Sequence, residues 1–341
     1  MDGATNPPWE KQSIMPLVTS SFEPSRFLRN GHLQTIIPVL AKRRFATAFR
    51  HERMELADGD FLDLDWAILK RERLAILSHG LEGSSKDPCV RGMADRLFER
   101  GWDVLAWNYR GCGPEPNRLV RSYHSGETGD LKAIIVVAAA SYATIALIGF
   151  SLGGNVTLKY LGEGGCHPAV AAGVAISAPI DLESSAAEID RRWGNWFYRR
   201  RFLGSLLAKY EAKALRFPDR LNAPGSHKVR TLREFDELYT APIHGFRDAI
   251  DYWKQSSAKQ YLSEITVPTL LLNARDDPFL TDDSLPFTEA QENPNLFLEV
   301  PASGGHIGFI DSIYNISPWH EQRTLDFLAQ LGLTKALQDR R

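Results

Sequence analysis

The chain has 341 residues, 43% of them hydrophobic, so it can bury a large core as one elaborated domain or as one domain with an insertion. Its 40 basic residues nearly balance its 42 acidic residues, which excludes the strong basic character typical of proteins that bind nucleic acid or an acidic membrane surface. The three cysteines show no CxxC spacing, which disfavours a disulfide framework and a zinc cluster and indicates a reducing compartment. We therefore expect a small neutral substrate and no nucleic-acid partner.

The first fifty residues have mixed composition and no clear period, and they predict an irregular N-terminal arm over residues 1–50. Residues 1–24 lack the basic and apolar regions of a secretory signal, so we expect the protein in the cytoplasm. The apolar run 133–150 is long enough to be considered as a membrane span, but polar residues interrupt it near its middle. We interpret this run as a buried helix, a turn and a buried strand, and we expect no integral membrane span.

From residue 51 the pattern changes to short apolar runs that alternate with helical stretches. Asp58-Gly59 lies between two short alternating runs and predicts a β-hairpin. The apolar runs that follow are 74–78, 103–107, 145–150, 172–176, 269–272 and 296–300. Helical stretches such as 90–100 and 153–161 separate them, which predicts an α/β fold with a mainly parallel sheet and helices on both faces.

This alternation stops over residues 181–257, so a helical insertion divides the core into residues 51–180 and 258–341. The insertion follows a predicted strand end and would sit at the carboxyl edge of the sheet, where the ligand crevices of open α/β sheets lie. We therefore expect a lid that supplies the apolar wall of an acyl pocket, with Trp193 and Trp196 in contact with substrate. Its apolar side chains at near-helical spacing are Trp193, Trp196, Phe197, Phe202, Leu206 and Leu207. The alternative is that these aromatic residues only anchor the insertion. The basic cluster 199–201 beside them could meet lipid or a partner, but it fits a solvated helix face better.

The strongest local signal is the GxSxG pentapeptide at residues 149–153. A predicted strand precedes it and a helix-compatible run follows it. Its glycines allow a tight strand-to-helix turn that holds the serine hydroxyl clear of the sheet. This context favours a catalytic nucleophile at Ser151 over a serine that merely caps the helix.

A serine nucleophile needs a base, and the base needs an acid that orients it. In hydrolases whose serine lies on such a strand-to-helix turn, the acid and then the histidine follow the serine along the chain. The residues past the predicted strand 269–272 include Asp276 and Asp277, and the run 296–300 leads into two glycines and His306. We favour Asp276 as the acid because of its offset from the strand end, although the sequence leaves Asp277 open. His124 precedes the serine, which makes it a lesser candidate for the base.

Acyl transfer also needs hydrogen-bond donors for the developing oxyanion. The turn HGLEG after the run 74–78 is where such hydrolases place one donor, and the residue after the nucleophile supplies the other. We assign these donors to the backbone amides of Leu81 and Leu152, and we expect His79 and Gly80 beside the substrate. A polar loop over residues 110–128 follows another strand end, and it either lines the pocket or forms a charge network of its own.

Several motifs together resemble the YheT-like branch of the α/β-hydrolases. They are FLRNGHLQT at 27–35, HGLEG at 79–83, NRL at 117–119, SYHSGET at 122–128, GFSLGGN at 149–155, NARDDPF at 273–279 and GGHIGF at 304–309. The resemblance spans roughly residues 22–325, and GHLQT and SYHSGET are far more specific than GxSxG. That branch includes mammalian lipid hydrolases and yeast alcohol acyltransferases. The resemblance implies an α/β-hydrolase fold and a triad of Ser151, Asp276 and His306.

These inferences predict a carboxylic ester hydrolase that works through an acyl-serine intermediate, without a metal or an organic cofactor. Its partner would be a small-molecule ester with a short- to medium-chain or lipid-like acyl group. Two rivals remain open at this point. The same acyl-enzyme could transfer its acyl group to an alcohol, or the chain could be a non-catalytic binding module on a hydrolase scaffold.

Overall fold

The computed structural model describes residues 16–41, 43–221, 228–313 and 316–334. In this part of the chain nine strands form one sheet with the order β1-β9-β8-β7-β6-β4-β5-β3-β2. The strands are β1 (Leu17–Val18), β2 (Arg50–Glu55), β3 (Phe61–Ala67), β4 (Arg73–Ser78), β5 (Asp103–Asn108), β6 (Thr144–Phe150), β7 (Val170–Ile176), β8 (Thr269–Leu272) and β9 (Leu296–Glu299). The hairpin predicted around Asp58-Gly59 is present, because β2 and β3 pair antiparallel.

The sheet is mainly parallel. Strand β3 pairs antiparallel with β5, whereas the neighbouring strands from β5 through β4, β6, β7, β8 and β9 to β1 pair parallel. The parallel strands are short and apolar because both of their faces are buried. In β4, Leu74 and Ile76 belong to one apolar core and Ala75 and Leu77 belong to the other, as the two-residue period of a strand requires.

Helices cover both faces of the sheet, which confirms the predicted fold class. The helices of the core are α1 (Gly31–Leu40), α2 (Pro88–Glu99), α3 (Gly129–Ala139), α4 (Leu152–Gly162), α10 (Phe287–Glu292) and α11 (Trp319–Gln330). Helices α3 and α4 share one apolar core with the strands, and α2 and α11 share the other. The apolar run 133–150 divides between α3 and β6, as predicted. No helix in the described ranges combines the length and the apolar character that crossing a bilayer requires.

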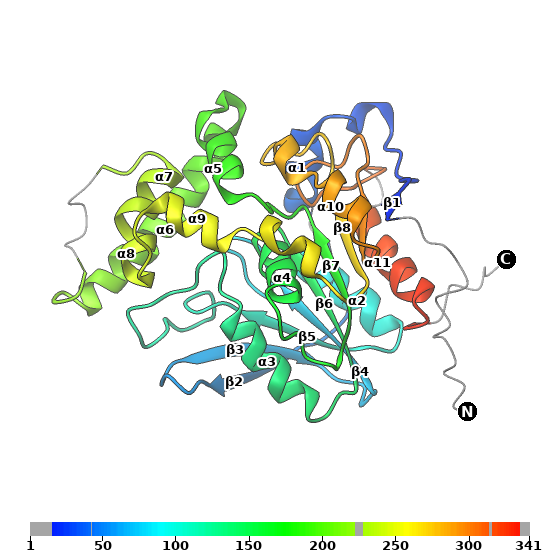
Figure 1. The fold of residues 1–341 in the computed structure, drawn as a ribbon, viewed down its shortest axis with the longest axis horizontal. Coiled ribbons are helices and arrows are strands. Elements are labelled where there is room, and N and C mark those ends of the chain that lie inside the picture. The colour runs from blue at the N-terminus through cyan, green and yellow to red at the C-terminus, as the bar shows by residue number, and fades with distance from the viewer. Residues whose placement is uncertain (1–15, 42, 222–227, 314–315, 335–341) are drawn as a thin grey trace.

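The helices between β7 and β8 form a cap beyond one end of the strands (Figure 1). They are α5 (Leu182–Arg191), α6 (Trp196–Arg216), α7 (Leu232–Phe235), α8 (Ala241–His244) and α9 (Ala249–Ser256). A π-helical turn, Asp236–Thr240, joins α7 to α8. These helices bury an apolar core of their own, which includes Tyr198, Leu203, Tyr210 and Trp253. We call this segment, residues 182–256, the cap.

The prediction of an irregular arm over residues 1–50 is wrong in part. Residues 1–15 lie outside the described residues, but β1 pairs with β9 and helix α1 covers Gly31–Leu40. The side chain of Asn30 accepts a hydrogen bond from the amide of Leu33 and so caps this helix. Pro38 lies inside α1 and interrupts the helical pattern in the sequence.

Candidate active site

Ser151 occupies the sharp turn between β6 and α4. Its backbone has φ 52° and ψ −121°, a conformation that non-glycine residues rarely adopt. The flanking glycines make this turn possible by close approach: a Cβ atom on Gly149 would lie 2.1 Å from the Gly153 carbonyl oxygen, and one on Gly153 would lie 2.3 Å from that of Ser78. The predicted turn is therefore present, and the hydroxyl group faces the cavity below the cap.

His306 links Ser151 to a carboxylate. Its Nε2 atom lies 2.9 Å from Ser151 Oγ, and its Nδ1 atom lies 2.8 Å from Asp277 Oδ2. The Asp277 side chain is fully buried, and the Phe279 ring packs against the imidazole with its centroid 4.4 Å away. A serine, an imidazole and a buried carboxylate joined in this way can activate the hydroxyl group as a nucleophile.

The structure contradicts the assignment of the orienting carboxylate to Asp276. Asp276 Oδ1 accepts a hydrogen bond from the Gly305 amide at 2.8 Å, and burial raises the pKa of this carboxyl group. Asp277 Oδ1 accepts a hydrogen bond from the amide of Phe279, two residues farther along the chain, at 2.9 Å. This bond across Pro278 holds the carboxylate in the orientation in which Oδ2 reaches the imidazole. The residue before the proline therefore faces inward, whereas Asp276 holds the loop that carries His306.

The residues predicted for the oxyanion site lie beside Ser151. Leu152 is the first residue of α4, so its amide has no acceptor within the helix. A Cβ atom on Gly80 would lie 3.3 Å from Ser151 Cβ, which places the amide of the next residue, Leu81, in the same region. The side chains of Leu81 and Leu152 both line the cavity.

His79 does not contact substrate space. Its Nδ1 atom lies 2.7 Å from the Gly80 carbonyl oxygen and its Nε2 atom lies 3.3 Å from the Tyr109 amide. Burial lowers the pKa of His79 to about 3, so its ring is neutral and fixes the turn. His79 is buried and is not among the described residues that line the cavity, so the prediction that it contacts substrate is wrong. Gly80 is half-buried directly beside Ser151, and its contact with substrate stays a prediction.

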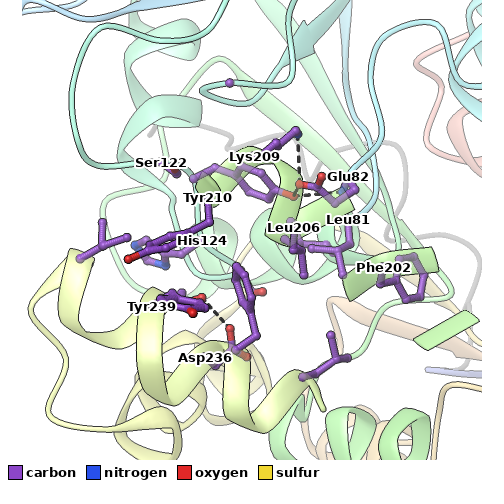
Figure 2. Close-up of a pocket in the computed structure, with 18 of the residues that line it drawn as sticks. Leu81, Glu82, Ser122, His124, Phe202, Leu206, Lys209, Tyr210, Asp236 and Tyr239 are labelled. Carbon is purple, nitrogen blue, oxygen red and sulfur yellow. Dashed lines mark hydrogen bonds and ion pairs between the residues drawn. The ribbon is translucent and has the colours of Figure 1, made fainter. Parts of the chain in front are cut away.

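A cavity of about 330 Å³ extends from Ser151 and His306 beneath the cap. Figure 2 shows Leu81, Glu82, Phe202 and Leu206 around one part of it, with Asp236, Tyr239 and His124 farther along. Its apolar lining includes Leu152, Leu182, Ala186, Ile189, Phe202, Leu206 and Phe235. Such a mixture of an apolar wall and a few polar groups suits a small molecule with a hydrocarbon chain.

The prediction that Trp193 and Trp196 contact substrate is wrong. Trp193 is 93% exposed and Trp196 is 53% exposed, and neither is among the described residues that line the cavity. The helical phase of α6 explains the error, because Phe202, Leu206 and Lys209 point to the cavity from one side of the helix. The spacing of the aromatic residues did not reveal which side of the helix would face inward.

The second histidine considered as a base lies elsewhere. His124 lines the cavity but packs against His244, with their ring centroids 4.8 Å apart. Burial and the neighbouring His244 hold the pKa of His124 well below its usual range. The loop 110–128 fulfils both of its predicted roles, since it lines the cavity and Arg110 also forms buried ion pairs with Asp60 and Asp130.

Helix α1 supports the His306 loop, a role that the sequence did not predict. Thr35 Oγ1 accepts a hydrogen bond from the His306 amide at 2.9 Å. Gln34 Nε2 donates to the Ile310 carbonyl oxygen, and Gln34 Oε1 accepts from the Ile310 amide, both at 2.8 Å. A Cβ atom on Gly31 would lie 1.9 Å from the Asp276 carbonyl oxygen. The GHLQT motif was a visible signal, but nothing in the sequence connected it with a loop some 270 residues away.

Glu82, which follows Leu81 and has a positive φ of 57°, is a second residue whose role the sequence did not predict. Its carboxylate accepts hydrogen bonds from Tyr123 OH at 2.7 Å, from Lys209 Nζ at 3.0 Å and from the Ser205 hydroxyl group. Although burial works against it, Cys112 and Glu82 raise the pKa of Lys209. Two cap residues on α6 therefore hold the turn that carries the Leu81 amide.

The described residues contain no group of three or more His, Cys, Asp or Glu side chains arranged to hold a metal ion.

Comparisons with known proteins agree with this architecture. The family described as "alpha/beta hydrolase fold" matches residues 76–313. The Escherichia coli (strain K12) protein YheT, whose name describes it as an esterase, is 37% identical over 319 residues, which cover 91% of this chain and 93% of that protein. The mouse phospholipase ABHD3 is 28% identical, over 89% of this chain and 76% of that protein. The chain therefore belongs to the α/β-hydrolase family, in its YheT-like branch.

A solved structure supports the fold independently. The Pyrococcus furiosus esterase Pf2001 superimposes with a TM-score of 0.56 at 20% sequence identity, covering 83% of this chain and 91% of that protein. A yeast protein named medium-chain fatty acid ethyl ester synthase/esterase 2 is 27% identical over 75% of this chain and 62% of its own length. Family and relatives are consistent with the predicted class of carboxylic ester hydrolases.

Proposed function

We propose that this protein is a serine hydrolase that cleaves carboxylic esters through a covalent intermediate on Ser151. One observation carries the proposal: the chain of contacts from Ser151 Oγ through His306 to the buried Asp277, with distances of 2.9 and 2.8 Å, at the foot of a largely apolar cavity. The substrate class is a small ester with a short- to medium-chain or lipid-like acyl group. The site needs neither a metal nor an organic cofactor for this chemistry.

The reaction begins when Ser151 Oγ attacks the acyl carbon and passes its proton to His306 Nε2. Asp277 holds Nδ1–H and stabilises the imidazolium, and the amides of Leu81 and Leu152 donate to the oxyanion. The bond to the alcohol oxygen then breaks, and His306 returns the proton to that oxygen. A water molecule repeats the attack on the acyl-serine and releases the acid, which regenerates the Ser151 hydroxyl group.

The cap acts as the wall of the acyl pocket in this proposal. Phe202 and Leu206 supply apolar surface opposite the serine, while Ser205 and Lys209 fasten the same helix to Glu82. This arrangement favours a fixed cover over a freely opening lid, because the polar contacts hold α6 on the turn that carries the Leu81 amide. The cytoplasm remains the expected location.

Acyl transfer to an alcohol is the second candidate, because an alcohol can replace water in the last step. The yeast relative is named both a synthase and an esterase, which supports acyl transfer as a second candidate for this chain. Product analysis with a p-nitrophenyl ester and added ethanol separates the two reactions. A predominance of ethyl ester over free acid would identify a transferase.

The test of the proposal is the variant Ser151→Ala, with Ser185→Ala as its matched control. Ser185 also lines the cavity, and its hydroxyl group has no hydrogen-bond partner among the described residues. We expect Ser151→Ala to lose fluorophosphonate labelling and about 10⁵-fold or more in kcat on p-nitrophenyl esters while keeping the wild-type melting temperature. Ser185→Ala should keep labelling and activity. A wild-type protein that neither labels nor hydrolyses any ester in the series would instead support a non-catalytic binding module.

A further inference from the structure

Three large aromatic side chains project into solvent where the cap turns from α5 into α6. Trp193 is 93% exposed, Trp196 is 53% exposed and Phe197 is 59% exposed. Single exposed apolar residues are normal on a protein surface, but contiguous ones mark a contact site. Steps of three and four residues separate Trp193 from Trp196 and Phe197, so the three rings lie on one stripe of the helix start.

These rings do not anchor the cap, which rules out the alternative considered from the sequence. The anchoring is done by Asn195, between Trp193 and Trp196, and by Tyr198, which follows Phe197. Asn195 is buried and donates to the Pro278 carbonyl oxygen at 2.6 Å, and Tyr198 packs edge-on against Phe279 with ring centroids 4.7 Å apart. The outward rings are therefore not required for the fold of this segment.

Arginines surround the same stripe. Arg191, Arg192, Arg200 and Arg201 are all exposed, and the Arg200 guanidinium lies 5.6 Å from the Trp196 ring centroid. Arg192 pairs with Glu188 at 2.8 Å. The whole chain carries a formal net charge of −2, so this concentration of positive charge is local. We call these four arginines together with Trp193, Trp196 and Phe197 the aromatic–arginine patch.

We propose that the aromatic–arginine patch docks onto a bilayer surface that contains anionic phospholipid. Indole rings prefer the boundary between headgroups and acyl chains, and arginines around them attract anionic headgroups, so the two features select the same partner. The opposite side of α6 carries Phe202, Leu206 and Lys209, which line the cavity. Docking therefore brings the wall of the cavity next to the membrane.

Co-sedimentation of the full chain with lipid vesicles tests this proposal. The probes are vesicles of phosphatidylcholine with phosphatidylglycerol and vesicles of phosphatidylcholine alone. We expect about tenfold or more tighter binding to the anionic vesicles, weakened by salt, because arginines near an anionic surface contribute an electrostatic attraction that salt screens. The tryptophan fluorescence should shift to the blue on binding, and that shift should shrink in the variant with Trp193→Ser and Trp196→Ser.

Two variants and one matched control sharpen the result. The triple variant Trp193→Ser, Trp196→Ser, Phe197→Ser and the pair Arg200→Gln, Arg201→Gln should each lose most of the binding. The control is Val136→Ser with Val137→Ser on α3, whose side chains are 54% and 58% exposed but lie outside the patch, and it should bind like the wild type. All variants should keep wild-type activity on a p-nitrophenyl ester without vesicles, since none of these residues lines the cavity in the described structure.

Equal binding to both kinds of vesicle, or undiminished binding by the triple variant, would overturn the proposal. Light scattering provides a further check. A stable dimer of the wild type that becomes a monomer in the triple variant would also overturn the proposal, because a second copy of the chain would then cover the patch. Ser151→Ala binds vesicles like the wild type if the proposal holds. The docking test therefore stays separate from the test of ester hydrolysis.

Discussion

The turns that carry Ser151, Asp277 and His306 and the cap above them are held in different ways. The turns sit at strand ends and are fixed through their backbone: the two glycines around Ser151 allow close approach, and the amides of Phe279 and His306 donate hydrogen bonds to Asp277 and Thr35. The cap is fixed instead by polar and charged side chains. Ser205, Lys209 and Lys213, spaced four residues apart on α6, bond to loops that follow β4 and β5.

This difference suggests a division of labour. The turns fix the reacting atoms, and changes there should lower kcat by orders of magnitude. In the proposed mechanism the cap shapes the acyl pocket, and its Lys209 balances the charge of Glu82 beside the Leu81 amide. Changes in the cap should therefore alter the selectivity for acyl chains, or lower kcat by leaving a charge near the oxyanion. Four predictions, taken from the largest expected effect to the smallest, test this division.

The adjacent carboxylates give the largest contrast. Asp277→Asn should lower kcat by about 10⁴-fold, because the imidazole loses the carboxylate that orients its Nδ1–H and stabilises the imidazolium. Asp276→Asn should change kcat by less than about tenfold and act mainly on stability, because Asp276 holds the Gly305 amide. Steady-state kinetics and thermal unfolding of both variants provide the comparison. The reverse ranking would return the catalytic role to Asp276.

The error between these two residues shows what the sequence can specify. The alternation of apolar runs and helices predicted the α/β fold, because it rests on local pattern. The GxSxG context and the chain order predicted the pair Ser151 and His306, whose side chains lie 2.9 Å apart in the structure. The choice of Asp276 counted residues from a strand end. In the structure the turn at Pro278 determines which carboxylate contacts the imidazole. One oxygen of Asp277 accepts a hydrogen bond from the Phe279 amide, and the other lies against His306 Nδ1.

The remaining misses depend on contacts that only the folded chain brings about. Thr35 supports the amide of His306 from a distant part of the chain, and Trp193 and Trp196 face solvent because Asn195 and Tyr198 supply the inward contacts of this segment. Helical periodicity gives the spacing of a stripe but not the direction in which it points.

The second prediction concerns the contact between the cap and the oxyanion turn. Lys209→Met should lower kcat by about 10- to 100-fold with little change in KM, because an uncompensated Glu82 carboxylate beside the Leu81 amide opposes the developing negative charge. Lys209→Arg should retain most of the activity. Kinetics on a short-chain p-nitrophenyl ester, whose acyl group makes few contacts with the cap, measure the effect.

A double variant distinguishes this electrostatic role from a structural one. Glu82→Gln combined with Lys209→Met removes both charges and should recover much of kcat. If the double variant is as slow as Lys209→Met, or if KM rises while kcat stays constant, then the contact serves only to hold α6 in place.

The third prediction separates the two sides of α6. Phe202→Ala should raise kcat/KM for longer acyl chains relative to shorter ones by about tenfold, because the lost ring enlarges the apolar wall of the cavity. Trp196→Ala is the matched control, an aromatic residue on the same helix that points to solvent. Its chain-length profile should equal that of the wild type. Identical profiles for all three proteins would place the acyl pocket outside the cap.

The last and smallest effect concerns Asp236, in the π-helical turn of the cap. Its carboxylate lines the cavity and accepts hydrogen bonds from Thr240 Oγ1 at 2.6 Å and Trp253 Nε1 at 2.8 Å. Burial raises the pKa of Asp236 to about 6, from a usual value of 3.8, so the folded protein prefers the neutral acid. The stabilisation is complete below pH 3.8 and is lost as the pH rises through about 6.

Asp236→Asn cannot ionise, so its stability should not carry this dependence. The melting temperature of the variant minus that of the wild type should therefore increase between pH 5 and pH 8, by an amount that corresponds to at most about 2 kcal/mol. Taking this difference at each pH cancels the titration of every other group that the substitution leaves unchanged. The sign of the change is the decisive result. A difference that falls as the pH rises would mean that Asp236 is stabilised as a carboxylate by Thr240 and Trp253, and that the cap tolerates its charge.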